Sequence, residues 1–456
     1  MTSIKNSVRW PDIHRKSESL VSGFTFYFFI YFVIDFFIRF SARFPVYALI
    51  RPTLIAIFIL LVLLFVQKDK FKNKIGDPVF SAFFILVAYI IFSIPFVEWP
   101  GSVLRVNLDI FFKASVFLFF VALFVDTEKR LKIFLFVFLG CQIFRVFEPL
   151  YLNITSGYWG SSTYLSSKEF ANRLAGAPAD VINPNELGFV IATAVPFLHY
   201  LLWPMSWKAK ALYLFLMPML LYALILTMSR GGFIALLVVA FFVFKESKRK
   251  FRLLVVGFLS AILAFSVMTP VQKERYLSLI DRDAEGGTSA DGRIRGMVNE
   301  FKLGMTRPIF GHGLGTTPEA KVHKLGSREA SHNLYAEVLI ELGLVGFFIF
   351  MAFLLRIIKK LFLVRASFSK LSSENLGFYA RLNKALITLF WMYAVYSINY
   401  WGLSQYYWYL FAGLVIAFSN LALRNVRDQP CIGSGDEGYL NGSRFRLANS
   451  IRERSF

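Results

Sequence analysis

The fold of this chain is decided by long apolar stretches such as residues 210–244, which read KALYLFLMPMLLYALILTMSRGGFIALLVVAFFVF. Segment 210–228 approaches the roughly 20 residues with which a helix crosses about 30 Å of hydrocarbon, and segment 232–244 predicts a shorter second helix. The chain has 456 residues, of which 56% are hydrophobic and 53 are phenylalanine. No soluble domain can bury that much apolar surface, so the sequence predicts a polytopic membrane protein.

Twelve apolar windows predict an all-α fold of about twelve transmembrane helices. Most of them approach the length of a membrane span, and polar residues separate them. The windows are residues 22–41, 46–66, 79–97, 106–125, 131–152, 187–204, 210–228, 232–244, 253–270, 334–355, 385–400 and 407–423.

Cation-rich short loops predict the orientation of these helices. Placing the clusters at 68–72, 128–132, 245–250 and 356–365 on one side satisfies the bias of cytoplasmic loops towards Lys and Arg, and it puts both termini in the cytoplasm. The predicted domains are an N-terminal cytoplasmic segment (1–21), a transmembrane domain (22–427) and a disordered cytoplasmic tail rich in Gly, Ser and Arg (428–456).

Two long loops then face outward. Residues 153–186 form the first, and residues 271–331, between spans nine and ten, form the larger second loop, whose polar composition predicts a small folded cap with short helices. Long loops cross the membrane regardless of their charge, so the cations of the second loop do not contradict this side.

The net charge of +21 does not indicate nucleic-acid binding. The basic residues are spread through the loops, and neither zinc-ligand spacing nor an RNA-binding signature accompanies them. Cys141 falls in a predicted span and Cys431 in the tail, so no disulfide is expected.

Four arginines are candidates for binding an anionic, phosphate-bearing substrate. Arg230 lies at the outer junction of spans seven and eight, and two glycines follow it and allow close approach to the backbone. A guanidinium binds phosphate oxygens through two parallel hydrogen bonds. The other candidates, all in outer loops, are Arg173, Arg293 and Arg295. The alternative is that the Arg230 side chain extends to the membrane surface and that the loop arginines are solvated.

His332 is the predicted general base. It precedes span ten at an outer helix mouth, and histidine titrates near neutral pH without strong perturbation. The alternative is that His332 is an interfacial histidine at a helix cap, because its neighbours Ser331 and Asn333 are good cap residues. His312 lies in Gly-His-Gly-Leu-Gly, which predicts a tight turn, and His312 and Asn333 are further candidates for contacts to the acceptor.

Other charged residues are predicted to be structural. Glu337 lies about 140° round a helix from His332, so Glu337 and Glu341 are poor partners for it. The run Asp281-Arg282-Asp283 is predicted to be solvated. Within the spans, the pairs Asp35 with Arg39 and Asp109 with Lys113 have the spacing of helical ion pairs, whereas Arg51 and Arg145 lack an obvious partner.

Several motifs resemble the O-antigen ligase and polymerase superfamily, the family with a Wzy-C type core. The resemblance covers about residues 100–355, with the long outer loop in the expected place. The motifs are Arg173 to Glu186, Thr227-Met228-Ser229-Arg230-Gly231-Gly232, Gly292-Arg293, Pro308 to Gly315, and Ser331 to Gly346.

This resemblance implies a GT-C-like glycosyltransferase of the bacterial inner membrane whose active site faces the periplasm. Such an enzyme takes a glycan from undecaprenyl diphosphate without a metal ion or cofactor and inverts the anomeric carbon. On this basis Arg173, Arg230, Arg293 and Arg295 hold the diphosphate, and His332 activates the acceptor hydroxyl. The acceptor is the lipid A core in O-antigen ligation, which the motifs match most closely, or a growing polysaccharide in a polymerase. The alternative from another class is a polysaccharide-lipid transporter.

Overall fold

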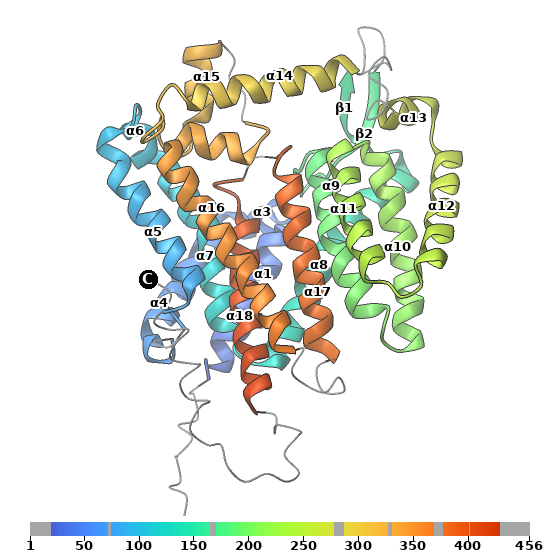
Figure 1. Cartoon of the computed structure of the whole chain (residues 1–456), viewed down its shortest axis with the longest axis horizontal. Helices are drawn as coiled ribbons and strands as arrows, with labels where there is room; N and C mark the ends of the chain where they lie inside the picture. Colours follow the sequence, from blue (N-terminus) through green and yellow to red (C-terminus); the bar gives the residue numbers. More distant parts are fainter. Residues whose placement is uncertain are drawn as a thin grey trace, which may run out of the picture.

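The computed structural model describes residues 20–71, 74–164, 170–277, 287–326, 331–368, 377–400 and 402–428. Helices make up most of it (Figure 1). The first half contains α1 (Gly23–Ile38), α2 (Phe40–Arg43), α3 (Pro45–Leu49), α4 (Pro52–Val66), η1 (Lys68–Lys70), α5 (Pro78–Ser93), η2 (Ile94–Phe96), α6 (Pro100–Ser102), η3 (Val103–Asn107), α7 (Leu108–Phe124), α8 (Glu128–Ser156), β1 (Gly160–Tyr164), β2 (Phe170–Leu174), α9 (Pro184–Phe197) and η4 (Leu198–Leu202). The second half contains α10 (Trp207–Thr227), α11 (Arg230–Glu246), α12 (Lys250–Val267), α13 (Pro270–Leu277), α14 (Gly287–Gly304), α15 (Thr317–Leu325), α16 (Leu334–Phe368), α17 (Gly377–Tyr396) and α18 (Tyr406–Asp428).

The protein is a multi-pass membrane protein. Each of the twelve predicted windows coincides with helical structure, and eight helical segments in the described part of the chain are long and apolar enough to cross a membrane. The helices α1 and α4 are also apolar but shorter. The count of twelve spans therefore stays a prediction.

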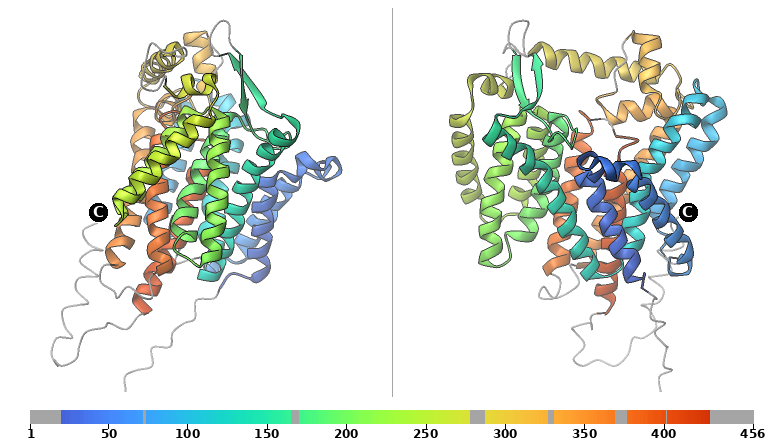
Figure 2. Two further views of the ribbon diagram at one scale, coloured as in Figure 1. Left: turned by 90° about the vertical axis from the view of Figure 1, so that its right-hand side faces the viewer. Right: turned by 180° about the vertical axis from the view of Figure 1, so that it is seen from behind.

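Short helices and a hairpin cover one end of the helix bundle. Figures 1 and 2 show α13, α14 and α15 together with β1 and β2 at this end, whereas α1 begins and α18 ends at the opposite end. The short helices predicted for residues 271–331 are thus present, and we call α13–α15 the cap. The antiparallel hairpin, in which Gly160 pairs with Leu174, was not predicted from the sequence.

Helix α16 is broken near its start. Gly343 has φ +67°, and an added Cβ would lie 2.5 Å from the carbonyl oxygen of Ile309, so a larger residue does not fit. The Tyr89 hydroxyl on α5 fixes this break by donating to the carbonyls of Ile309 and Leu342, each at 2.8 Å. Figure 1 shows the short first part of α16 at an angle to the long second part.

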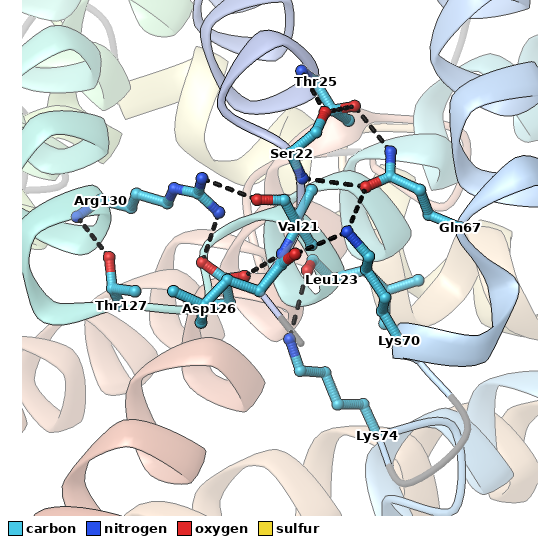
Figure 3. A network of polar contacts seen from close by, with 11 residues as sticks. Val21, Ser22, Thr25, Gln67, Lys70, Lys74, Leu123, Asp126, Thr127 and Arg130 are labelled. Atoms are coloured by element: carbon cyan, nitrogen blue, oxygen red, sulfur yellow. Dashed lines mark hydrogen bonds and ion pairs between the residues drawn. The ribbon is translucent and has the colours of Figure 1, made fainter. Parts of the chain in front are cut away.

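A polar network fastens the start of α1 at the opposite end of the bundle (Figure 3). The backbone N–H of Val21 donates to Asp126 at 2.7 Å, and Arg130 bridges Asp126 and the Val21 carbonyl. Lys70 donates to the Leu20 carbonyl at 2.6 Å. These bonds join the chain before α1 to the loops before α8 and after α4.

The predicted pairing of Asp35 with Arg39 is wrong. Helix α1 ends at Ile38, and Arg39 adopts φ +55°, which turns its side chain off the helix and towards Asp180 at 3.3 Å. Asp35 instead accepts from the hydroxyls of Thr53 and Tyr47. By contrast, the pairing of Asp109 with Lys113 is confirmed.

Arg145 has a partner that its sequence neighbourhood did not indicate. Its Nε donates to Asp180 at 2.6 Å, and both side chains are buried. Removing one member of such a pair leaves an uncompensated buried charge. Asp180, which also pairs with Arg39, therefore ties α8 and the end of α1 to the segment before α9.

Candidate functional site

The turn between α10 and α11 gathers buried arginines. Met228 has φ +51° at this turn, and the Ser229 side chain caps α11 by accepting from the N–H of Gly232 at 3.1 Å. Arg230 is therefore the first residue of α11, where it is only 7% exposed. Its Nε donates to the carbonyl oxygen of Arg275 at 3.1 Å.

Arg275 is a member of this cluster that sequence reasoning missed. It lies on α13, is 8% exposed, and donates from Nε to the Met228 carbonyl at 3.0 Å. The neighbouring phenol of Tyr276 donates to Leu224. Burial raises the pKa of Tyr276 above its usual range, although Arg173 and Arg275 act in the opposite direction, so this phenol stays neutral.

Arg173 joins the same turn from the β-hairpin. Its side chain is buried, and its Nε donates to the Thr227 carbonyl at 2.9 Å. A second nitrogen donates to the side chain of Asn185 at 3.0 Å. Asn185 lies in the first turn of α9, whose start Asn183 caps. We call Arg173, Arg230 and Arg275 the arginine cluster, because all three bond to backbone carbonyls at or beside one turn.

Glycines permit this turn to pack closely on α9. An added Cβ at Gly232 would lie 3.0 Å from the Cα atom of Gly188, and one at Gly231 would lie 3.3 Å from the ring of Tyr396. The two glycines after Arg230 therefore allow the close backbone approach that the sequence predicted.

His332 lies exposed at the start of α16, between two buried neighbours. Ser331 donates to Glu300 of α14 at 2.8 Å, and Asn333 accepts from the N–H groups of Tyr335 and Ala336. Asn333 thus caps α16, as the alternative interpretation of this segment stated. Fixed by these neighbours, His332 occupies the helix mouth at the cap end of the bundle.

Hydrogen bonds join both the start of α16 and the start of α9 to the end of α17 and the residues that follow it. The N–H of Leu334 donates to the carbonyl of Tyr400 at 2.9 Å, and the Tyr396 hydroxyl donates to the carbonyl of Asn185 at 2.7 Å. Asn185 in turn binds Arg173. The start of α16 and the arginine cluster therefore lie at the same end of the bundle and share α9 and the end of α17.

His312 is enclosed, although it was predicted as a candidate contact for the acceptor. Gly311, Gly313 and Gly315 all have positive φ, which confirms the tight turn. The His312 ring is 0% exposed, and it is bonded through Nδ1 to Glu98 at 2.5 Å and through Nε2 to the Thr306 hydroxyl at 3.0 Å. This geometry favours a structural role.

The two candidate arginines of the second outer loop, Arg293 and Arg295, both lie on α14, but only the Arg295 side chain is described. Arg295 is exposed on α14, and no hydrogen bond or ion pair within the described residues joins it to the arginine cluster. Arg293 also lies on α14, but its side chain falls outside the described part of the structure, as does the run Asp281-Arg282-Asp283.

The two glutamates on α16 hold backbone together, as predicted. Glu337 accepts from the N–H groups of Gly402 and Leu403, and Glu341 accepts from the N–H of Gly315 and the hydroxyl of Thr317. They fix the loop before α18 and the turn after His312 to α16, which is a structural role.

The comparison with known families bears on this end of the bundle. Residues 212–351 match the family described as O-Antigen ligase. Over these residues the chain is similar to this family, which supports the resemblance to the O-antigen ligase and polymerase superfamily that the motifs indicated. The matched segment contains Arg230, Arg275 and His332, whereas Arg173 precedes it. Among curated proteins, none was found to match.

The O-antigen ligase match supports a ligase activity of the glycosyltransferase kind. The turn that holds Arg230 and the mouth that holds His332 both come from the matched segment. The family match therefore includes residues from both the arginine cluster and the start of α16, which lie at the cap end of the bundle.

Proposed function

We propose that the protein is a membrane glycosyltransferase that transfers a glycan from undecaprenyl diphosphate to an acceptor on the periplasmic face. The proposed reaction is O-antigen ligation to the lipid A core. In this proposal the cap end of the bundle faces the periplasm of the bacterial inner membrane. The O-antigen ligase match and the multi-pass helical fold support this choice.

The arginine cluster carries the proposal. Three guanidinium groups are buried around one turn at a bundle end, which concentrates positive charge there. A diphosphate suits such a site, because its oxygens accept the paired hydrogen bonds of guanidinium groups. As the glycosidic bond breaks, negative charge develops on the diphosphate, and fixed cations stabilise it.

His332 supplies the second part of the proposed mechanism. Its exposed position allows the imidazole to remove a proton from an acceptor hydroxyl. The hydroxyl oxygen then attacks the anomeric carbon from the face opposite the diphosphate. The C–O bond to the diphosphate breaks, the carrier leaves as undecaprenyl diphosphate, and the configuration inverts. Arg293 and Arg295 of α14 are proposed to assist in holding the diphosphate.

Substitution of Arg230 tests the arginine cluster. We expect Arg230→Ala to lower glycan transfer about 10²–10³-fold, as removal of one donor from a charge-stabilising site does. Arg230→Lys keeps the charge but loses the planar fork, and we expect it to restore only part of the activity. Arg252→Ala, an exposed arginine at the start of α12, is the control. Full transfer by Arg230→Ala at normal membrane levels contradicts the proposal.

Deletion of the gene in its host separates ligation from the alternatives. Loss of a ligase leaves core without polymer and polymer still on its lipid carrier. Loss of a polymerase leaves core that carries a single repeat unit, and loss of a transporter leaves the donor lipid on the inner leaflet. Electrophoresis of the lipopolysaccharide, together with analysis of carrier-linked glycan, distinguishes these outcomes.

A further inference from the structure

An apolar cavity lies at the end of the bundle opposite the cap. Its volume is about 500 Å³, within the range typical of ligand pockets. The lining comes from α8, the end of α9, η4, α10 and the start of α17, and it includes Leu139, Ile143, Leu201, Leu212 and Leu216. A cavity with such a lining does not hold ordered water, so it suits a hydrocarbon chain.

The shape of the cavity follows from local helix structure. Its wall on α8 runs from Lys132 to Ile143, which is about 17 Å at the rise of an α-helix. An added Cβ at Gly140 on this wall would meet nothing within 4 Å. Opposite, α9 continues into the π-helical segment η4, a form that is rare and occurs often at functional sites.

Two cations lie at one end of this apolar lining. Of the described residues that line the cavity, only Lys132 and Arg381 are charged. Lys132 pairs with Glu128 at 2.5 Å and lies over the ring of Phe378, so its charge is already offset. The Arg381 Nε is buried and has no hydrogen-bond partner among the described residues. A buried donor without a partner costs free energy, so this position favours an anionic acceptor.

Tryptophans place this cationic end at the membrane surface. Trp203 and Trp207 flank the turn between η4 and α10 and are 43% and 74% exposed. Tryptophan is enriched at the level of lipid headgroups, where its ring is half in water. The cavity therefore extends from the headgroup level into the hydrocarbon of the leaflet at this end, with the cations outermost.

We infer that this cavity binds one anionic glycerophospholipid, with an acyl chain between α8 and α10 and the phosphate on Arg381. The acyl chain of such a lipid matches the apolar lining. Its phosphate matches the Arg381 guanidinium, whose Nε has no hydrogen-bond partner among the described residues. The site lies at the end of the bundle away from the arginine cluster, so it is separate from the proposed donor site. It does not rest on the proposed function.

Photolabelling of the full-length protein tests the inference. The probe is a phosphatidylglycerol with a diazirine near the end of one acyl chain, present at trace level in phosphatidylcholine nanodiscs. We expect labelled peptides from α8, η4 and α10, and weaker labelling by the same diazirine on phosphatidylcholine. Equal labelling by the two probes, or labelling confined to other helices, overturns the inference.

Two substitutions separate headgroup binding from chain binding. Arg381→Gln is expected to reduce labelling by the phosphatidylglycerol probe about fivefold, the effect of one cation near a lipid surface. Gly140→Leu fills the cavity and is expected to abolish labelling on α8. The matched control is Gly257→Leu on α12, where an added Cβ also meets nothing within 4 Å. Unchanged labelling in both cavity variants overturns the inference.

Competition identifies the source of the bound lipid. Unlabelled phosphatidylglycerol is expected to displace the probe at lower concentration than undecaprenyl phosphate does. Stronger displacement by undecaprenyl phosphate assigns the cavity to the prenyl carrier and overturns the inference. Size-exclusion profiles show whether each variant is folded, and Gly140→Ala, a smaller change at the same position, replaces Gly140→Leu if that protein aggregates.

Discussion

Two histidines on either side of α15 have opposite environments. His312 is fully enclosed, bonded to Glu98 and Thr306, and stacked on Trp99 with the ring centres 5.6 Å apart. His332 is exposed at the mouth of α16. In the sequence, both histidines lie in polar segments near glycines or cap residues. The comparison teaches that burial within the fold, rather than the local motif, separates an enclosed imidazole from an exposed one.

The largest expected effect is on catalysis by His332. We expect His332→Ala to reduce glycan transfer about 10²–10⁴-fold, because a general base contributes that much. His332→Gln keeps a polar side chain but no base, so it should be equally inactive. The measurement is transfer of carrier-linked glycan by purified protein, with the thermal unfolding midpoint as a control for folding. Full transfer by both variants would remove His332 from the mechanism.

The next effect is on stability through His312. We expect His312→Ala to lower the free energy of unfolding by about 1–3 kcal/mol, because buried polar partners lose their hydrogen bonds. Thermal unfolding in detergent measures this change. The same substitution should leave transfer per folded molecule within a few-fold of the wild type. A stable but inactive His312→Ala protein would reverse the comparison between the two histidines.

Trp99 sharpens the comparison with a smaller change. Its ring stacks on both His312 and His323, the latter at 5.4 Å between ring centres. We expect Trp99→Leu to lower stability by roughly 0.5–1.5 kcal/mol beyond the loss of buried area. The matched control is Trp207→Leu, because Trp207 is 74% exposed at the other end of the bundle. Equal unfolding midpoints of the two variants would contradict the stacking argument.

The smallest expected effect on stability is at Arg295. This side chain is exposed on α14, so Arg295→Ala should change stability by no more than about 0.5 kcal/mol. If the proposed role in holding the diphosphate is right, transfer falls while the unfolding midpoint stays constant. Unchanged transfer would restrict the donor site to the arginine cluster.

The sequence predicted the features that depend on local pattern. Apolar windows identified the helices because a span must satisfy its own backbone in hydrocarbon. Local cap chemistry likewise indicated the start of α16 at Asn333, whereas the cap at Ser229, which begins α11, was not predicted. The motif that contains Arg230 also lay where the buried cluster forms.

Features that depend on distant partners were missed for a physical reason. Asp180 lies 35 residues from Arg145 and pairs with it only because α8 and the segment before α9 meet in space. Arg275 sits in a run of charged residues that resembles any solvated helix, so no local signal separated it from a surface arginine. The same limit explains the error at Arg39, whose orientation depends on where α1 ends.

The break at Gly343 makes α16 two rods connected by a hinge that Tyr89 holds. The upper rod carries His332 at its start, and the lower rod runs through the bilayer. A thicker or thinner bilayer changes the tilt of the rod after Gly343. Such a tilt reaches the residues before Gly343 through one backbone joint and not along a continuous helix. Along α16, His332 is thereby connected to the membrane-crossing rod through this joint alone.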